Sequence, residues 1–258
     1  MKTHVIEEHR NFKESSVLFK SEERKAIDAA ISTVTVHRME LEIYISLHPE
    51  FRYTLDPVMV EVDAPRIVKL MAQSTSPFDI GPMAAVAGVL ADIAVEAMLN
   101  AGARIAIVEN GGEISASSDE PFTVGLYAGR NILSKRIGFQ IEPSDCPIGI
   151  ATSSATVGHA ISFGEADAVT VFADTAGIAD GAATAICNSV KGKDVKASVQ
   201  RGLAFAEKFG NIIRGVFIVR GKYVGSVGKI PKLVDVESGL EQDKASLKDV
   251  MDSNTVFL

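Results

Sequence analysis

Three oxygen-bearing side chains recur at intervals of four residues along one predicted helix. Asp180, Thr184 and Asn188 therefore share one face of that helix, because residues four apart are neighbours on a helical surface. A carboxylate and a hydroxyl on one face suit a hard cation such as Mg²⁺, which takes oxygen ligands. Nearby Asp174 would add negative charge. The alternative is structural, with Asp180 as the N-terminal cap of its helix and Thr184 buried.

A pair of glycines follows a predicted buried strand, in the turn Asn110-Gly111-Gly112-Glu113. Glycine adopts the backbone angles of such turns easily, and its missing side chain lets a ligand approach the backbone amides. These four residues are therefore candidate ligand-binding residues. An ordinary tight turn with a polar tip is the alternative.

A run of hydroxyls and a histidine follow another strand. The run is Thr152-Ser153-Ser154, and hydroxyls of this kind can bind a phosphate or the edge of a heterocycle. His159 comes shortly after and titrates near neutral pH, so it is the candidate acid/base, with a structural role as the alternative. Asp79 precedes a buried helix and is a further binding candidate, or else the cap of that helix.

Hydrophobic periodicity predicts the elements that position these groups. The helices are expected over residues 21–37, 64–74, 82–100, 178–190 and 194–209. The strands are expected over residues 103–109, 122–127, 137–141, 148–151, 168–173, 216–220 and 223–227. Residues 1–20 are expected to be extended. Residues 40–47 fit either a strand or a continuation of the first helix, up to the break at His48-Pro49.

This mixture of helices, strand runs and hairpins predicts the α+β class, with helices packed on antiparallel or mixed sheets. Neither a repeat nor a linker is visible, so we expect a single domain over residues 1–258. It comprises an N-terminal region (1–73), a motif-bearing core (74–190) and a C-terminal helix and hairpin with a peripheral tail (191–258).

The composition excludes several classes of protein. Of 258 residues 47% are hydrophobic, which is too apolar for a disordered chain. The formal charge of −7 argues against a protein that coats nucleic acid. P-loop, dinucleotide-fold, nucleophile-elbow and HExxH motifs are absent from the sequence.

The sequence also favours a cytoplasmic protein. Its N-terminus is polar and is not expected to be a signal peptide. Cys146 and Cys187 lie far apart, as free thiols in a reducing compartment would. Asp92 and Glu96 interrupt the most apolar stretch, 80–99, so we expect a buried helix there and no membrane association.

Taken in order, five segments resemble motifs of the ApbE superfamily, the flavin transferases that attach FMN from FAD to a protein Thr or Ser. The resemblance covers residues 74–190. The matching segments are Ser76-Pro77-Phe78-Asp79-Ile80, Ala87-Gly88 with Asp92 and Ala101-Gly102, Asn110-Gly111-Gly112-Glu113-Ile114, Ala151-Thr152-Ser153-Ser154, and Ala179-Asp180 through Thr184-Ala185.

The resemblance implies a single ApbE-like domain from a divergent prokaryotic branch. It also implies Mg²⁺ held by Asp180 and Thr184, FAD or another nucleotide-like ligand, and a protein acceptor. Separately from the resemblance, a homo-oligomer is an open option. Two departures stand out: Ala87 replaces the family's lysine, and the Asp-Pro that follows the family's histidine is missing after His159. The competing hypothesis is therefore a non-catalytic ligand-binding or partner protein on the same scaffold.

Overall fold

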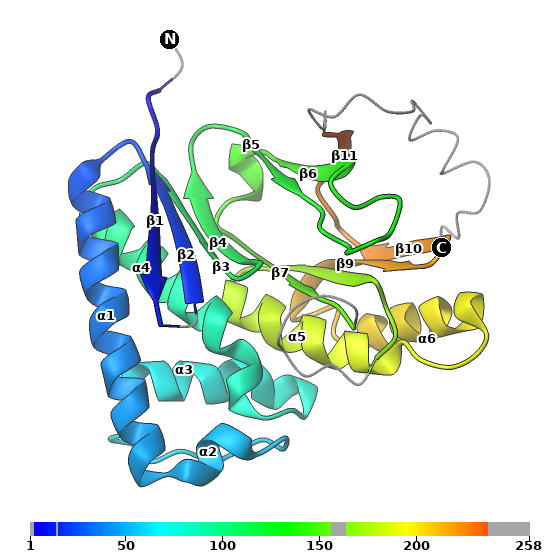
Figure 1. The fold of residues 1–258 in the computed structure, drawn as a ribbon, viewed down its shortest axis with the longest axis horizontal. Coiled ribbons are helices and arrows are strands. Elements are labelled where there is room, and N and C mark those ends of the chain that lie inside the picture. Colours follow the sequence, from blue (N-terminus) through cyan, green and yellow to red (C-terminus); the bar gives the residue numbers. More distant parts are fainter. Residues whose placement is uncertain (1–2, 14, 156–163, 237–258) are drawn as a thin grey trace.

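A large sheet between two other layers forms the centre of the computed structural model, which describes residues 3–13, 15–155 and 164–236. Its strand order is β1-β2-β3-β4-β7-β8-β9-β10, and every neighbouring pair is antiparallel. A small antiparallel sheet, β11-β6-β5, covers one face, and the helices cover the other (Figure 1). The predicted α+β class is confirmed.

Runs of strands and runs of helices follow one another along the chain. The strands of the large sheet are β1 (Ile6–Phe12), β2 (Ser15–Ser21), β3 (Ile105–Asn110), β4 (Glu113–Ser118), β7 (Ile148–Ser153), β8 (Ala168–Ala173), β9 (Ile213–Arg220) and β10 (Tyr223–Gly228). The small sheet consists of β5 (Phe122–Gly125), β6 (Ile137–Ile141) and β11 (Lys232–Asp235). The helices are α1 (Arg24–Leu47), α2 (Pro49–Tyr53), α3 (Arg66–Thr75), α4 (Val86–Asn100), α5 (Ala176–Ser189) and α6 (Val195–Glu207). Three short 3₁₀ helices are η1 (Ser76–Phe78), η2 (Pro82–Ala85) and η3 (Pro143–Asp145).

The core fills both gaps beside the large sheet. On the helical side, Ala106 and Val108 of β3 pack against α1 and α4, whereas Ile107 between them packs toward the small sheet. This follows from the two-residue period of a strand. The side chain of Phe139 in β6 contacts Phe172 and Phe217 edge to face and joins the two sheets.

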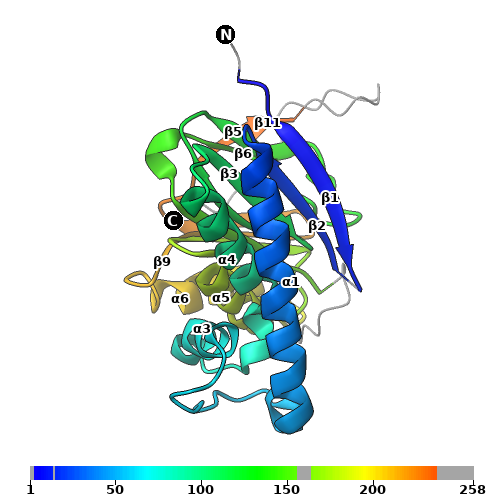
Figure 2. The same ribbon diagram turned by 90° about the vertical axis from the view of Figure 1, so that its left-hand side faces the viewer.

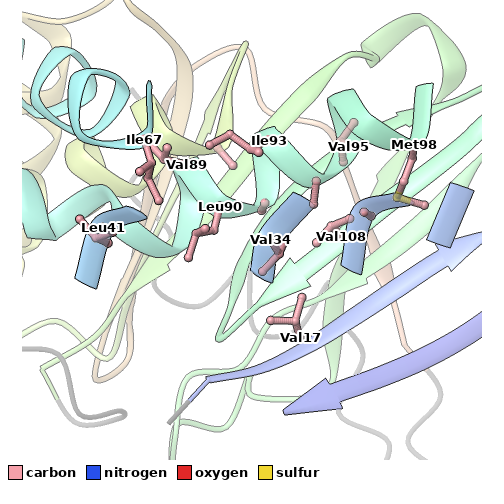
Figure 3. Close-up of a cluster of buried hydrophobic side chains, with 14 of the residues drawn as sticks. Val17, Val34, Leu41, Ile67, Val89, Leu90, Ile93, Val95, Met98 and Val108 are labelled. Carbon is pink, nitrogen blue, oxygen red and sulfur yellow. The ribbon is translucent and has the colours of Figure 1, made fainter. Parts of the chain in front are cut away.

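α4 is the central helix of the helical layer. Its side chains, among them Leu90, Ile93 and Met98, lie between α1, α3 and β3 (Figure 3; Figure 2 shows α1 in front of α4). By length and composition alone the stretch Pro82–Asn100 could cross a membrane, but 56% of its apolar window is buried inside the protein. The predicted burial of this helix is confirmed, and it accounts for the apolar composition.

Most predicted elements are present, with differences at their ends. Residues 40–47 continue the first helix, so the helical alternative was right. The predicted helix at Pro82 begins as η2 and becomes α-helical only at Val86. β4 and β11 were not predicted, and residues 1–20 include a hairpin of β1 and β2. β5 ends at Gly125, two residues before the predicted end of that strand.

Candidate functional site

α4 and α5 cap each other across their N-terminal ends. Asp180 of α5 accepts a hydrogen bond from the backbone N–H of Gly88 in the first turn of α4, at 3.0 Å. In return, Asp92 of α4 accepts bonds from the N–H groups of Ala176 and Gly177, both at 2.8 Å. The first N–H groups of a helix have no partner within the helix. Each helix therefore satisfies donors of the other with a carboxylate.

Glycine makes this crossing possible. A Cβ atom on Gly88 would lie 2.3 Å from the carbonyl oxygen of Ala176, and one on Gly177 would lie 2.7 Å from a methyl group of Val89. Neither space admits a side chain. The alanine and glycine residues of these two helices therefore allow their backbones to approach closely.

Asn110 binds the same turn of α4 from the sheet side. Its side chain is buried, and its amide donates to the carbonyl oxygen of Ala87 at 3.1 Å. Because Gly111 and Gly112 follow with φ of +73° and +113°, the chain reverses at once into β4. Glu113 opens β4 and pairs with Asn110 across the turn. The glycine turn is thus fixed beside the start of α4.

This geometry puts two half-buried carboxyl groups, those of Glu113 and Asp180, close together. Burial raises the pKa of Glu113 well above its ordinary value, and the charges of Asp180 and Glu109 raise it further. Burial likewise raises the pKa of Asp180 to about 7, while the Gly88 N–H lowers it and the charge of Asp92 raises it. Burial also raises the pKa of Asp92, although its two backbone donors oppose the shift. Such clusters of raised pKa values mark candidate functional sites.

A cavity of about 390 Å³, which we call the carboxylate cavity, opens beside this pair. Glu113, Asp180, Thr184 and Asn188 line it together, so the predicted common face of the three α5 residues does meet one space. The opposite wall comes from α2 and the residues after it, Arg52 to Leu55. The sequence analysis missed this wall, because nothing in its local pattern relates it to α5.

A second cavity, of about 370 Å³, lies on the other side of the glycine turn. We call it the sheet cavity, because strands β2 to β5 and β7 contribute its walls. Gly111, Gly112, Thr152 and Ser154 line it, together with apolar and aromatic side chains that include Phe122 and Tyr127. The candidate ligand residues are thus divided between two cavities that meet at residues 110–113.

Three described candidate residues line neither cavity, and the first of them is Asn110, whose buried amide binds the Ala87 carbonyl oxygen instead. Asp79 is exposed in a left-handed conformation (φ +57°), on neither cavity wall, and no side-chain bond from it caps η2 or α4. The expectation that it caps the following helix was wrong, because Asp180 reaches α4 instead. Ser153, the last residue of β7, is also on neither wall, since neighbouring strand residues point to opposite faces and Thr152 lines the sheet cavity. His159 lies outside the described residues.

Two further expectations from the sequence were wrong. Asp180 does not cap its own helix, because Thr175 and Asp92 bind the N–H groups at that end. Asp174 pairs on the surface with Arg214 at 2.7 Å and adds no charge to the carboxylate cavity. Cys146 and Cys187 are not in disulfide bonds, as expected.

The coordination shell of a bound cation would need ligands in addition to the protein side chains. Within the described residues, no group of three His, Cys, Asp or Glu side chains is arranged to hold a metal ion. Glu113, Asp180 and Thr184 nevertheless offer two carboxylates and a hydroxyl to one cavity. Mg²⁺ commonly binds through one or two carboxylates, with water and phosphate oxygens as its other ligands. The donor set therefore fits Mg²⁺ together with a phosphorylated ligand.

The arrangement of elements is similar to that of solved ApbE proteins. The apo form of the flavinyl transferase ApbE of Pseudomonas stutzeri matches with a TM-score of 0.51 at 14% identity, covering 91% of this chain and 95% of that one. The ApbE protein of Thermotoga maritima matches with a TM-score of 0.52 at 12% identity, covering 91% and 97%. The protein thus has the α+β fold of the ApbE proteins.

Sequence comparison identifies the family within that class. The chain belongs to the family described as AbpE bacteria, whose model matches residues 5–211. The UPF0280 protein of Methanothermobacter thermautotrophicus is 43% identical over 215 residues, 83% of this chain and 81% of its own length. The UPF0280 protein of Methanopyrus kandleri is 42% identical over 228 residues, 88% and 92% of the two chains. The predicted resemblance to the ApbE superfamily is confirmed.

Proposed function

We propose that this protein is an Mg²⁺-dependent cytoplasmic enzyme that binds FAD or a similar nucleotide ligand containing a diphosphate. One observation carries the proposal: the half-buried carboxyl groups of Glu113 and Asp180 line one cavity together with Thr184. Buried carboxylates are costly unless they are paired, bind a metal or are protonated. A divalent cation would balance both negative charges, and its remaining coordination positions would be open to phosphate oxygens.

Asp180 and Thr184 would hold the cation from α5, and Glu113 from the glycine turn. Bound Mg²⁺ would neutralise charge on the diphosphate as it is cleaved. Asp180 also binds the Gly88 N–H, so its second oxygen is the one available to the cavity. The reciprocal caps with Asp92 would keep this carboxylate in place without the ligand.

The sheet cavity suits the flat ring of the same ligand. Phe122 and Tyr127 offer aromatic surface, and Thr152 and Ser154 offer hydroxyls. Gly111 and Gly112 line the sheet cavity, and the next residue, Glu113, lines the carboxylate cavity. A Cβ at Gly112 would meet no atom within 4 Å, so the backbone there is open to a ligand. A ligand with a ring on one side of a diphosphate would cross the turn at this point.

In the proposed reaction, the diphosphate bond of FAD breaks while a phosphorus–oxygen bond forms to an acceptor hydroxyl. AMP leaves, and the hydroxyl proton passes to a base, for which His159 is the candidate. The acceptor would be a Ser or Thr of a protein. The flavinyl transferase named above supports this chemistry by its fold alone.

A second candidate function is ligand binding without transfer. Ala87 favours it, because a methyl group lines the carboxylate cavity where the superfamily pattern has a lysine. Without the positive charge of that lysine, the phosphate of the leaving AMP would lose one source of stabilisation.

Calorimetry and product analysis together test both functions. In the calorimeter, FAD is titrated into the protein in the presence of Mg²⁺ or of EDTA. In a separate assay, AMP release is followed with a mixture of cell proteins added as the acceptor. We expect Mg²⁺-dependent binding that Asp180→Asn weakens about tenfold or more. Asp174→Asn is the matched control, because this exposed carboxylate faces Arg214. Binding without AMP release would favour the second function, and a lack of binding to FAD or any other nucleotide would refute both.

A further inference from the structure

Exposed apolar side chains are concentrated in one short part of the chain. Of the eleven large apolar side chains that are exposed within the described residues, eight lie between residues 36 and 62. They are Val36, Met39, Ile43, Leu47, Tyr53, Leu55, Met59 and Val62, and we call them the outer apolar surface. Met59 is 100% exposed and Val62 94%. Exposed apolar side chains gathered in one part of a chain are typical of an interaction site.

Half of this surface is a single stripe along α1. Val36, Met39, Ile43 and Leu47 follow one another at intervals of three or four residues, so they share one helical face. That face lies opposite the buried face, which contains Val34, Leu41 and Tyr44 among others. Figure 2 shows α1 at the front of the molecule, with its lower half beyond the sheet.

The charged residues beside the stripe already have partners in their own chain. Glu40 contacts His37 at 2.8 Å, and Glu42 contacts Lys13 at 2.6 Å. Arg38 donates to the Ser15 hydroxyl at 3.2 Å. A second apolar helix would therefore approach charged groups that are already hydrogen-bonded or ion-paired within this chain.

We propose that the outer apolar surface binds a second copy of this chain around a twofold axis. In an antiparallel pair of α1 helices centred near residue 41, Val36 of one copy faces Leu47 of the other, and Met39 faces Ile43. The stripe is thus complementary to itself, as an isologous interface requires.

The available area supports a stable dimer. Only Tyr53 of the eight is aromatic, the class that buries roughly 150–250 Å² per side chain, and the other seven are smaller, so the eight together present at most on the order of 1,000 Å². A standard interface buries about 800 Å² on each partner. A lipid surface fits less well, because residues 36–62 contain five acidic residues and only two of Lys and Arg.

The same surface borders the carboxylate cavity. Tyr53 and Leu55 are 73% and 60% exposed, and both also line that cavity. A second copy seated on residues 53–62 would lie beside its opening. The dimer proposal itself stands on the apolar surface and does not depend on the proposed ligand.

The mass of the full-length protein in solution tests this inference. Light scattering coupled to size exclusion should give twice the mass of the chain, and Ile43→Glu should raise the dimer dissociation constant about a hundredfold or more. Ile132→Glu is the control, because Ile132 is also exposed (57%) but lies elsewhere, and it should leave the dimer intact. Circular dichroism melting verifies that each variant is folded.

A charge-exchange pair tests the orientation of the helices. Met39→Lys and Ile43→Glu should each give monomers, whereas the double variant M39K/I43E should dimerise again, because each Lys then faces a Glu of the other copy. A wild-type protein that is monomeric at its highest soluble concentration would overturn the proposal. So would a dimer that survives Ile43→Glu, or a monomer that sediments with anionic lipid vesicles.

Discussion

Asn110 and Asp180 bind opposite ends of one peptide group, the one that joins Ala87 to Gly88. The amide of Asn110 donates to the Ala87 carbonyl oxygen, and the Gly88 N–H donates to the carboxylate of Asp180. Residues 70 positions apart in the sequence, one beside the glycine turn and one on α5, are thereby held against the same turn of α4. The cavity walls on both sides of residues 110–113 depend on this arrangement.

Substitution at the helix crossing should destabilise the fold. Gly88→Ala would place a methyl group against the carbonyl of Ala176, where the Cβ distance would be only 2.3 Å. Overpacking of this kind costs about 1–3 kcal/mol, and a backbone contact cannot relax as a side chain does. Urea denaturation should show this loss for Gly88→Ala. Gly210→Ala is the control, since the nearest atom to its Cβ would be 3.5 Å away, and an equal loss there would contradict the explanation.

Loss of the Asp92 carboxylate should weaken the start of α5. Asp92→Ala leaves the N–H groups of Ala176 and Gly177 without their acceptor in a buried place. We expect a loss of about 2–4 kcal/mol in the free energy of unfolding, because two bonds to a charged acceptor are removed. Thermal melting compared with Glu207→Ala, which removes an exposed carboxylate, measures the effect. Equal melting temperatures would show that Asp92 does not cap the helix in solution.

The raised pKa of Asp180 predicts a pH-dependent penalty on stability. The pKa rises from 3.8 to about 7 in the folded protein, so the folded state binds the proton more tightly than the unfolded chain between these values. Stability without metal therefore falls as pH rises from about 4 to about 7 and is then level. Asp180→Asn removes this contribution, and we expect it to be about 2–4 kcal/mol more stable than wild type at pH 8.

Paired denaturation curves at several pH values provide the measurement for Asp180. The two proteins should be nearly equal in stability at pH 4, and the gap should open with rising pH. Added Mg²⁺ should narrow it, because the ion would bind only the wild-type carboxylate. A constant gap at every pH would mean that Asp180 does not titrate in this range.

Thr184 should affect ligand binding more than folding. Thr184→Val keeps the shape of the side chain but removes the hydroxyl from the carboxylate cavity. We expect Mg²⁺-dependent affinity for FAD to fall about three- to tenfold, with the melting temperature little changed. Thr184→Ser should restore most of the affinity. If both variants bind as wild type does, Thr184 is not a ligand of the cation.

His159 should be needed for turnover and not for binding. Because His159 would accept the proton of the acceptor hydroxyl, His159→Asn should lower the rate of AMP release by about a hundredfold or more. Calorimetric affinity for FAD should stay within a few-fold of wild type. Loss of binding and turnover together would assign His159 to the ligand pocket instead.

The sequence alone determined the elements that rest on local patterns. The period of apolar residues predicted the helices, the glycine pair predicted the turn at residues 110–113, and the spacing of Asp180, Thr184 and Asn188 predicted their common face. Each of these depends on neighbours within a few residues. The ordered motifs also identified the family, because their order along the chain is itself a sequence property.

Only the tertiary structure decided which of these groups meet. Glu113 and Asp180 share a cavity because α4, α5 and the glycine turn converge, and no local pattern encodes that distance. Asp79 turns outward and Ser153 points to the other side of β7 for the same reason, since packing against distant elements sets which face is buried. Long-range contacts through Gly88 and Asp92 therefore determined the site, whereas short-range periodicity determined its parts.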